Sequence, residues 1–177
     1  ELHGPHLASA SDTLYVSQIV EGVRRYTAKR GAPVNLALPP LMYGSHPYHH
    51  WKMPGNIPLT YETHIALIMD IVRGASHAGY NKFIILSAHG QVSSTIVAVH
   101  KLGLEGYFAV SFHWYDFLRD DKDVLEDWMW HADEAETSVA LYLYPELVDM
   151  SLAAPGDGHG LIDAKWKIAP GAMPASA

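Results

Sequence analysis

Three side chains at the start of the sequence could together bind a divalent metal. In the opening segment ELHGPHLASASDT, Glu1 and His3 are two residues apart, so both side chains point to one side of an extended chain. Asp12 follows at the predicted start of a helix, where the helix dipole favours a carboxylate. Carboxylates and imidazoles are ligands for Zn, Mn and Fe. The alternative is a frayed terminus, a surface histidine and a helix cap, and these residues taken alone favour it.

A histidine follows the most apolar segment of the chain. In IILSAHGQV, His89 stands just beyond a predicted strand and just before a predicted helix. Ligands of parallel sheets bind at the carboxyl ends of strands, and the neighbouring Gly90 lets a ligand approach the backbone closely. We therefore expect His89 to bind a metal or a substrate, rather than only to make a hydrogen bond at a strand end.

A third group of chemically capable residues stands at the start of a later helix. The segment WMWHADEAETS places His131 and Glu136 across that start. Acidic residues in the first turns suit the helix dipole, so a capped surface helix is the simpler interpretation of this segment alone.

Alternating strands and helices predict the fold that positions these groups. Hydrophobic spacing predicts helices over residues 11–30, 60–78, 91–102 and 132–143, and a mixed, helical segment over 116–130. Strands are predicted over 34–38, 82–87 and 107–112, and a long loop over 41–59. The strands are apolar throughout, which is typical of a parallel sheet covered on both faces. We expect an α/β fold in one domain spanning residues 1–177.

Composition narrows the classes of function. The formal charge of −7 gives no broad basic surface, which argues against nucleic acid as a partner. No apolar run approaches the roughly 20 residues that span a bilayer, so no membrane association is expected. The absence of cysteine excludes disulfides and thiolate sites and is compatible with the cytoplasm, where we expect the protein.

Four motifs, in order along nearly the whole chain, resemble those of the creatininase (creatinine amidohydrolase) family. The first is E-x-H-G-x-H-L with an aspartate shortly after it, which matches residues 1–7 and Asp12. The others are a loop leading to F-P-G-T, a turn after a buried strand, and H-A-G-x-x-E-T-S. They resemble residues 43–56, 87–90 and 131–138.

This resemblance implies a three-layer α/β/α sandwich with a mostly parallel sheet, a homo-oligomer (usually a hexamer) and a two-metal site. By position, Glu1 and His89 would hold one divalent ion, His3 the other, and Asp12 would bridge both. The ions, Zn, Mn or Fe, would activate a water for attack on a carbonyl. His131 would carry a proton to the leaving group.

The chain also departs from the family pattern. Gln91 stands where creatininases have a carboxylate ligand, and Glu136 is our candidate replacement, with a metal-binding or catalytic role. The loop serine and glutamate of the family are displaced by the histidine-rich SHPYHH. These changes argue against creatinine as the substrate. The family's strand before the first motif and part of its C-terminal segment look absent, which predicts a fragment of a longer chain.

The aromatic and histidine residues around the site indicate a small substrate. We expect a cyclic amide or a cyclic polyhydroxy ketone such as an oxidised inositol. The predicted substrate-binding residues are Tyr48, His50, Gln91, Trp114 and Trp130. One alternative is a non-catalytic α/β module that binds a metal or small molecule through a degenerate second site. A flavodoxin-like nucleotide binder is disfavoured, because no glycine-rich fingerprint follows a strand.

Overall fold

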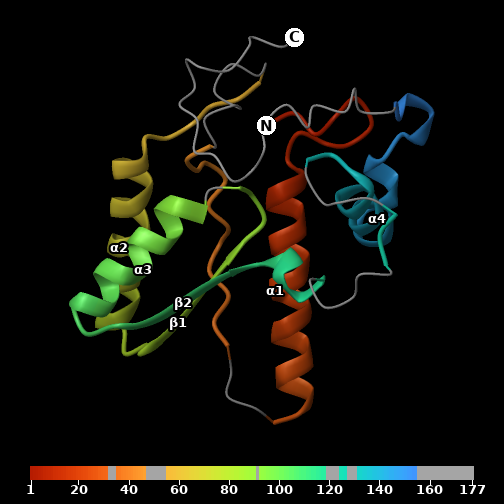
Figure 1. Cartoon of the computed structure of the whole chain (residues 1–177). Coiled ribbons are helices and arrows are strands. Elements are labelled where there is room, and N and C mark those ends of the chain that lie inside the picture. Colours follow the sequence, from red (N-terminus) through yellow and green to blue (C-terminus); the bar gives the residue numbers. More distant parts are fainter. Residues whose placement is uncertain (32–34, 47–54, 91, 119–123, 127–130, 155–177) are drawn as a thin grey trace. The chain divides into compact units, whose positions relative to one another are not determined.

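The computed structural model describes residues 1–31, 35–46, 55–90, 92–118, 124–126 and 131–154, and Figure 1 shows their arrangement into helices and strands. The elements are α1 (Ser11–Lys29), α2 (Tyr61–His77), β1 (Lys82–Ser87), α3 (Val92–Leu104), β2 (Phe108–His113) and α4 (Glu134–Leu143), with short 3-10 helices at Trp114–Leu118, Pro145–Leu147 and Met150–Leu152. Two compact units emerge. Unit 1 draws on residues 1–11, 47–57 and 121–177, and unit 2 on residues 12–46 and 58–120.

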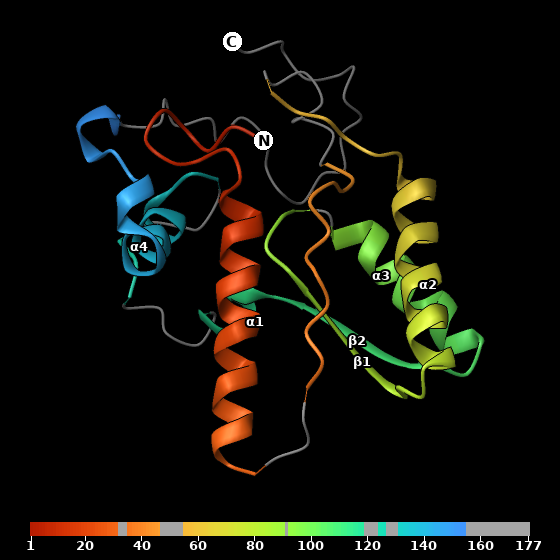
Figure 2. The same ribbon diagram turned by 180° about the vertical axis from the view of Figure 1, so that it is seen from behind.

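The core of unit 2 is a β1–α3–β2 crossover to which α2 is added. The two strands pair in parallel, from Lys82 opposite Phe108 to Ser87 opposite His113. Helices α2 and α3 lie side by side, as Figures 1 and 2 both show. Their buried side chains form one apolar cluster, against which alternate residues of the strands pack. The cluster contains Ile68, Met69, Val72, Ala98 and Leu102, and the packed strand residues are Phe83, Ile85 and Ala109.

The sheet confirms the predicted α/β class and the predicted parallel pairing. Strand 82–87 was placed correctly, and strand 107–112 shifts by one residue. Alternate side chains of a strand point to opposite faces. Among the described residues, the face opposite the helices remains open at Ile84 and Phe108, which are 66% and 60% exposed. Helices α2 and α3 pack against the other face.

Local sequence signals set the ends of the predicted helices. The hydroxyl of Thr60, the N-cap of α2, accepts a hydrogen bond from the Thr63 amide at 3.2 Å. After α2, Gly79 has a φ of 98°, and after α1, Gly31 has a φ of 66°, both in the left-handed region that favours glycine. The helices predicted over 11–30, 60–78, 91–102 and 132–143 are thus confirmed to within two residues at each end.

Two predicted elements were wrong in the described residues. Residues 35–38, expected to form a buried strand, have no regular structure, and Leu36 and Leu38 are about half exposed. An apolar run becomes a strand only when a neighbour supplies a backbone ladder, and none pairs with this one. Of the helix predicted over 116–130, the described residues 116–118 belong to a 3-10 helix at Trp114–Leu118, and residues 124–126 are not helical. The carboxylate of Asp116 accepts the His113 amide at 2.8 Å, which folds the chain tightly after β2.

In unit 1, the N-terminal segment is tied to the region around α4. The His6 carbonyl accepts the Asp149 amide at 3.0 Å, and His6 Nε2 lies 2.8 Å from Thr137 Oγ1 on α4. Gly4 has a φ of 65°, and a side chain there would meet the His6 ring at 3.0 Å. These contacts fix the path of residues 1–6. None of the helices in the described ranges combines the length and apolarity that a membrane span requires.

Candidate metal centre

Unit 1 brings together three potential metal ligands from distant parts of the sequence. Glu1, His3 and His131 each offer one ligand atom, and these atoms all lie within 4.8 Å of one another. The Nδ1 of His131 is 3.3 Å from Glu1 Oε1, and the His3 and His131 ring centroids are 4.7 Å apart. The Glu1 and His3 side chains are each 1% exposed. Carboxylate and imidazole atoms gathered at this spacing out of water suit a divalent cation, so the residues fit the ion that the sequence predicts.

Hydrogen bonds to the backbone orient the two imidazoles of this group. His131 Nε2 lies 2.7 Å from the Leu2 carbonyl, and a carbonyl can only accept, so the proton sits on Nε2. In the neutral ring this leaves the lone pair on Nδ1, the atom that faces Glu1. His3 Nδ1 likewise lies 3.2 Å from the Glu1 carbonyl, which directs its Nε2 away from that carbonyl. Such contacts to the second ring nitrogen are typical of metal-binding histidines.

Helix α4 places Glu136 beside this group. The Asp133 carboxylate caps α4 by accepting the Glu136 amide at 3.1 Å. The Glu136 carboxylate in turn accepts the Ala132 amide, and Ala132 has a φ of 51°, which is unusual outside glycine. Glu136 Oε2 lies 4.0 Å from His3 Nε2, and Glu136 is buried. The start of α4 thus adds a second carboxylate within reach of the His3 ring.

Unit 2 holds the other two predicted metal ligands. His89 Nδ1 lies 3.0 Å from Asp12 Oδ2, joining the end of β1 to the first turn of α1. His89 is 7% exposed. The structure therefore pairs two residues that are 77 positions apart in the sequence.

The structure adds His46, which the sequence did not single out as a ligand. Its ring centroid lies 4.4 Å from that of His89, in an edge-on arrangement, and His46 is 8% exposed. The histidine-rich segment SHPYHH was the available signal, but the prediction selected Tyr48 and His50 from it. Spacing within a loop does not reveal which side chain turns inward, because a loop has no fixed period.

A buried polar network lies beside this second group. His64 Nδ1 is 2.9 Å from Ser94 Oγ and 3.2 Å from Ser45 Oγ, and the two hydroxyl oxygens are 2.7 Å apart. All three residues are 2% exposed or less. Burial, together with repulsion from His89, lowers the pKa of His64 from 6.5 to about 4. His64 is therefore neutral at physiological pH.

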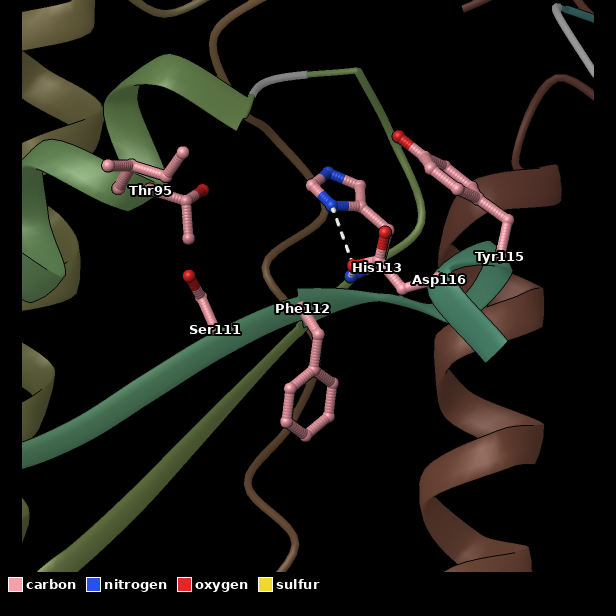
Figure 3. A pocket seen from close by; sticks show the side chains of 7 residues that line it. Thr95, Ser111, Phe112, His113, Tyr115 and Asp116 are labelled. Atoms are coloured by element: carbon pink, nitrogen blue, oxygen red, sulfur yellow. Dashed lines mark hydrogen bonds and ion pairs between the residues drawn. The ribbon is translucent and has the colours of Figure 1, made fainter. Parts of the chain in front are cut away.

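A small pocket of about 230 Å³ lies between α3 and the carboxyl end of β2 (Figure 3). His113, the last residue of β2, stacks on Tyr115 with centroids 4.8 Å apart, and its Nδ1 is 3.9 Å from Asp116 Oδ2. Ser111 and Thr95 complete the polar lining. His113 was not among the predicted site residues, although it stands at the end of an apolar strand just as His89 does.

The predicted substrate-binding residues are mostly outside the described part of the chain. Tyr48, His50, Gln91 and Trp130 fall there. Trp114 is described and is 6% exposed. Its ring packs against Tyr15 of α1 with centroids 5.8 Å apart, so its role in substrate binding stays a prediction.

Comparison with known proteins supports the resemblance noted in the sequence. The sequence model of the creatininase family, described as creatinine amidohydrolase, matches residues 1–175. A 3-dehydro-scyllo-inosose hydrolase from Thermotoga maritima is 32% identical over 92% of this chain and 53% of that protein. A creatinine amidohydrolase from Pseudomonas putida is 27% identical over 85% of this chain and 63% of that protein. The chain therefore spans between half and two thirds of the length of these relatives.

A solved structure gives the same assignment. A crystal structure of creatinine amidohydrolase (creatininase) superposes with a TM-score of 0.70 at 25% identity, over 88% of this chain and 66% of that one. Both the predicted α/β fold and the predicted family are confirmed. This chain belongs to the creatininase family.

Proposed function

We propose that the protein is a divalent-metal-dependent hydrolase that directs a water onto a carbonyl of a small cyclic substrate. The observation that carries this proposal is the gathering of ligand atoms of Glu1, His3 and His131 within 4.8 Å in unit 1, although His131 is 130 positions from Glu1 in the sequence. A structural helix start needs no buried imidazole beside a buried carboxylate. A metal-binding hydrolase does.

Each donor group has a role in this proposal. Glu1, His3 and Glu136 of unit 1, and Asp12 and His89 of unit 2, are the metal ligands. The family resemblance predicts about two ions per chain, of Zn, Mn or Fe. A bound ion supplies an activated water and polarises the carbonyl under attack.

His131 is the residue that we propose for proton transfer. The Leu2 carbonyl holds the proton on Nε2, so Nδ1 is the atom that takes up or releases the proton used in the reaction. Glu1 faces that atom at 3.3 Å and stabilises the ring when it is charged. The backbone and the carboxylate thus fix both the tautomer and the direction of His131.

Two relatives suggest the substrate class. One is named for hydrolysis of 3-dehydro-scyllo-inosose and the other for hydrolysis of creatinine. The higher identity to the first, and the loss of the family's loop serine and glutamate, favour a cyclic polyhydroxy ketone over a cyclic amide. We also propose a homo-oligomer, a hexamer by family resemblance, which light scattering on the full-length protein tests.

Metal content tests the central claim. Plasma mass spectrometry on the full-length protein is expected to find about two metals per chain. Asp12→Ala is expected to lose metal, whereas Asp70→Ala is expected to keep it, because the Asp70 side chain is 74% exposed on α2. If the wild-type protein binds no metal even after supplementation with Mn and Zn, the hydrolase proposal is wrong, and a non-catalytic binding module becomes the better account.

A substrate panel tests the reaction. It compares a cyclic polyhydroxy ketone, creatinine and linear peptides at equal concentration with the metal-loaded protein. We expect the ketone to be turned over faster than creatinine or the linear peptides. The His131→Gln variant is expected to retain its metal and to have a lower kcat. Turnover of linear peptides alone would contradict the substrate class, and an unchanged kcat in His131→Gln would remove that residue from the reaction.

A further inference from the structure

The His46 ring lies beside that of His89, a predicted metal ligand, with the ring centroids 4.4 Å apart. One ligand nitrogen of His46 is within 4.8 Å of one of His89, and both side chains are more than nine-tenths buried. Two nitrogens that bind one tetrahedral ion at about 2.1 Å each are roughly 3.4 Å apart, so a small side-chain movement brings both onto one ion. The two ring planes are inclined at 64°, so the rings meet edge-on rather than stacked face to face.

The chain before His46 is held in place by more than loop geometry. The Ser45 hydroxyl contacts His64 of α2 and Ser94 of α3, at 3.2 and 2.7 Å. The Gly44 carbonyl also accepts the Leu59 amide at 2.8 Å, which closes the other side of the loop. A network that anchors the preceding residue to two packed helices limits the positions open to the His46 ring. Such support is what a metal ligand needs from the groups around it.

Neighbouring imidazoles in unit 2 are not equivalent. His64 Nδ1 is engaged by both serine hydroxyls, and its lowered pKa of about 4 reflects burial. The rings of His46 and His89 instead meet edge-on. Asp12 Oδ2 stands 3.0 Å from His89 Nδ1. His46 and His89 thus supply two buried imidazoles within unit 2, and imidazole nitrogen is a common ligand of zinc.

We propose that His46 is a metal ligand that acts together with His89, and that Ser45, His64 and Ser94 position it. This inference rests on the proposed function, because it requires that unit 2 binds a divalent ion. It also accounts for a departure from the family pattern. His46 belongs to the histidine-rich SHPYHH, which displaces the family's loop serine and glutamate.

The absence of cysteine from the chain allows a direct test. The full-length protein is stripped with a chelator and reloaded with Co²⁺, whose visible absorption reports the number and geometry of its ligands. His46→Cys places the only thiol of the protein at this position, and a thiolate bound to Co²⁺ gives a charge-transfer band in the near ultraviolet. His100→Cys is the matched control, because His100 is exposed on α3.

We expect the charge-transfer band in His46→Cys and not in His100→Cys. In His46→Ala we expect the visible Co²⁺ spectrum to change and Zn²⁺ affinity, measured by calorimetry, to fall at least tenfold. His64→Gln is expected to weaken Zn²⁺ binding less and to leave the Co²⁺ spectrum close to that of the wild type.

The two proposals fail in different ways. If the wild-type protein binds two ions, but His46→Cys shows no band and His46→Ala keeps the wild-type affinity, His46 is not a ligand and the hydrolase proposal stands. If the wild-type protein binds no ion, both proposals are overturned.

Discussion

The buried imidazole of His64 makes the stability of the protein depend on pH. Desolvation, and to a smaller degree repulsion from His89, lowers its pKa from 6.5 to about 4 in the folded protein. The unfolded chain recovers the ordinary value, so below about pH 6.5 unfolding takes up a proton that the folded protein does not bind. Above pH 6.5 His64 is neutral in both the folded and the unfolded chain, and its titration does not affect stability. As pH falls from 6.5 toward 4, protonation of the unfolded chain lowers the free energy of unfolding.

The pKa difference sets the size of the effect. Each pH unit inside that window costs up to about 1.4 kcal/mol, so the free energy of unfolding falls by about 2 kcal/mol between about pH 7.5 and pH 5 because of this one group. Other carboxylates and histidines titrate over the same range. The comparison that isolates His64 is therefore with a variant that lacks the imidazole, His64→Gln.

The assay is urea unfolding followed by tryptophan fluorescence at the two pH values. A chelator is present throughout, because metal binding to histidine also depends on pH. The wild-type protein is expected to lose about 2 kcal/mol more than His64→Gln on acidification. His100→Gln, which removes an exposed histidine, is expected to follow the wild type. Equal losses in the wild type and in His64→Gln would refute the reasoning and show that His64 keeps an ordinary pKa in the folded protein.

Three further predictions concern stability and are checked by urea unfolding. Gly4→Ala is expected to cost about 2 kcal/mol and Gly79→Ala about 1, because both positions have positive φ but only a Cβ at Gly4 meets a neighbouring ring; equal losses would contradict this. Leu102→Ala, in the core, should cost roughly 2–5 kcal/mol, whereas Leu104→Ala, 90% exposed, should change stability by less than about 0.5. Asp133→Ala removes the cap of α4 and is expected to cost about 1 kcal/mol, and no loss would mean that the cap is dispensable.

Strong periodic segments of the sequence predicted most of the fold. Helix 60–78 had both a regular apolar spacing and capping residues, and it was found within one residue at each end. Segment 34–38 had only apolar character, and it forms no strand in its described part. A helix satisfies its own backbone hydrogen bonds, whereas a strand depends on a partner elsewhere in the chain, so the sequence predicts helices more securely.

The candidate site shows a similar division. Residues at the ends of predicted elements, such as His89 and Asp12, were identified by position, and the structure pairs them at 3.0 Å. The contact between His131 and Glu1 joins residues 130 positions apart in the sequence, and only the family resemblance placed both of them in one site. His46 lies in a loop, where neither periodicity nor a capping rule applies. Its inward position depends on buried serines that the sequence gives no reason to connect.

The core of unit 2 is encoded in one unbroken stretch of sequence. Every member of its apolar cluster comes from residues 65–109, in four elements that follow one another along the chain. Contacts between neighbouring elements close short loops, so we expect this stretch to fold early. Asp12 and His46 come from segments before it and would join His89 later. Metal binding would then complete an existing fold rather than begin it, and a cell short of metal would accumulate folded, empty protein instead of unfolded chains.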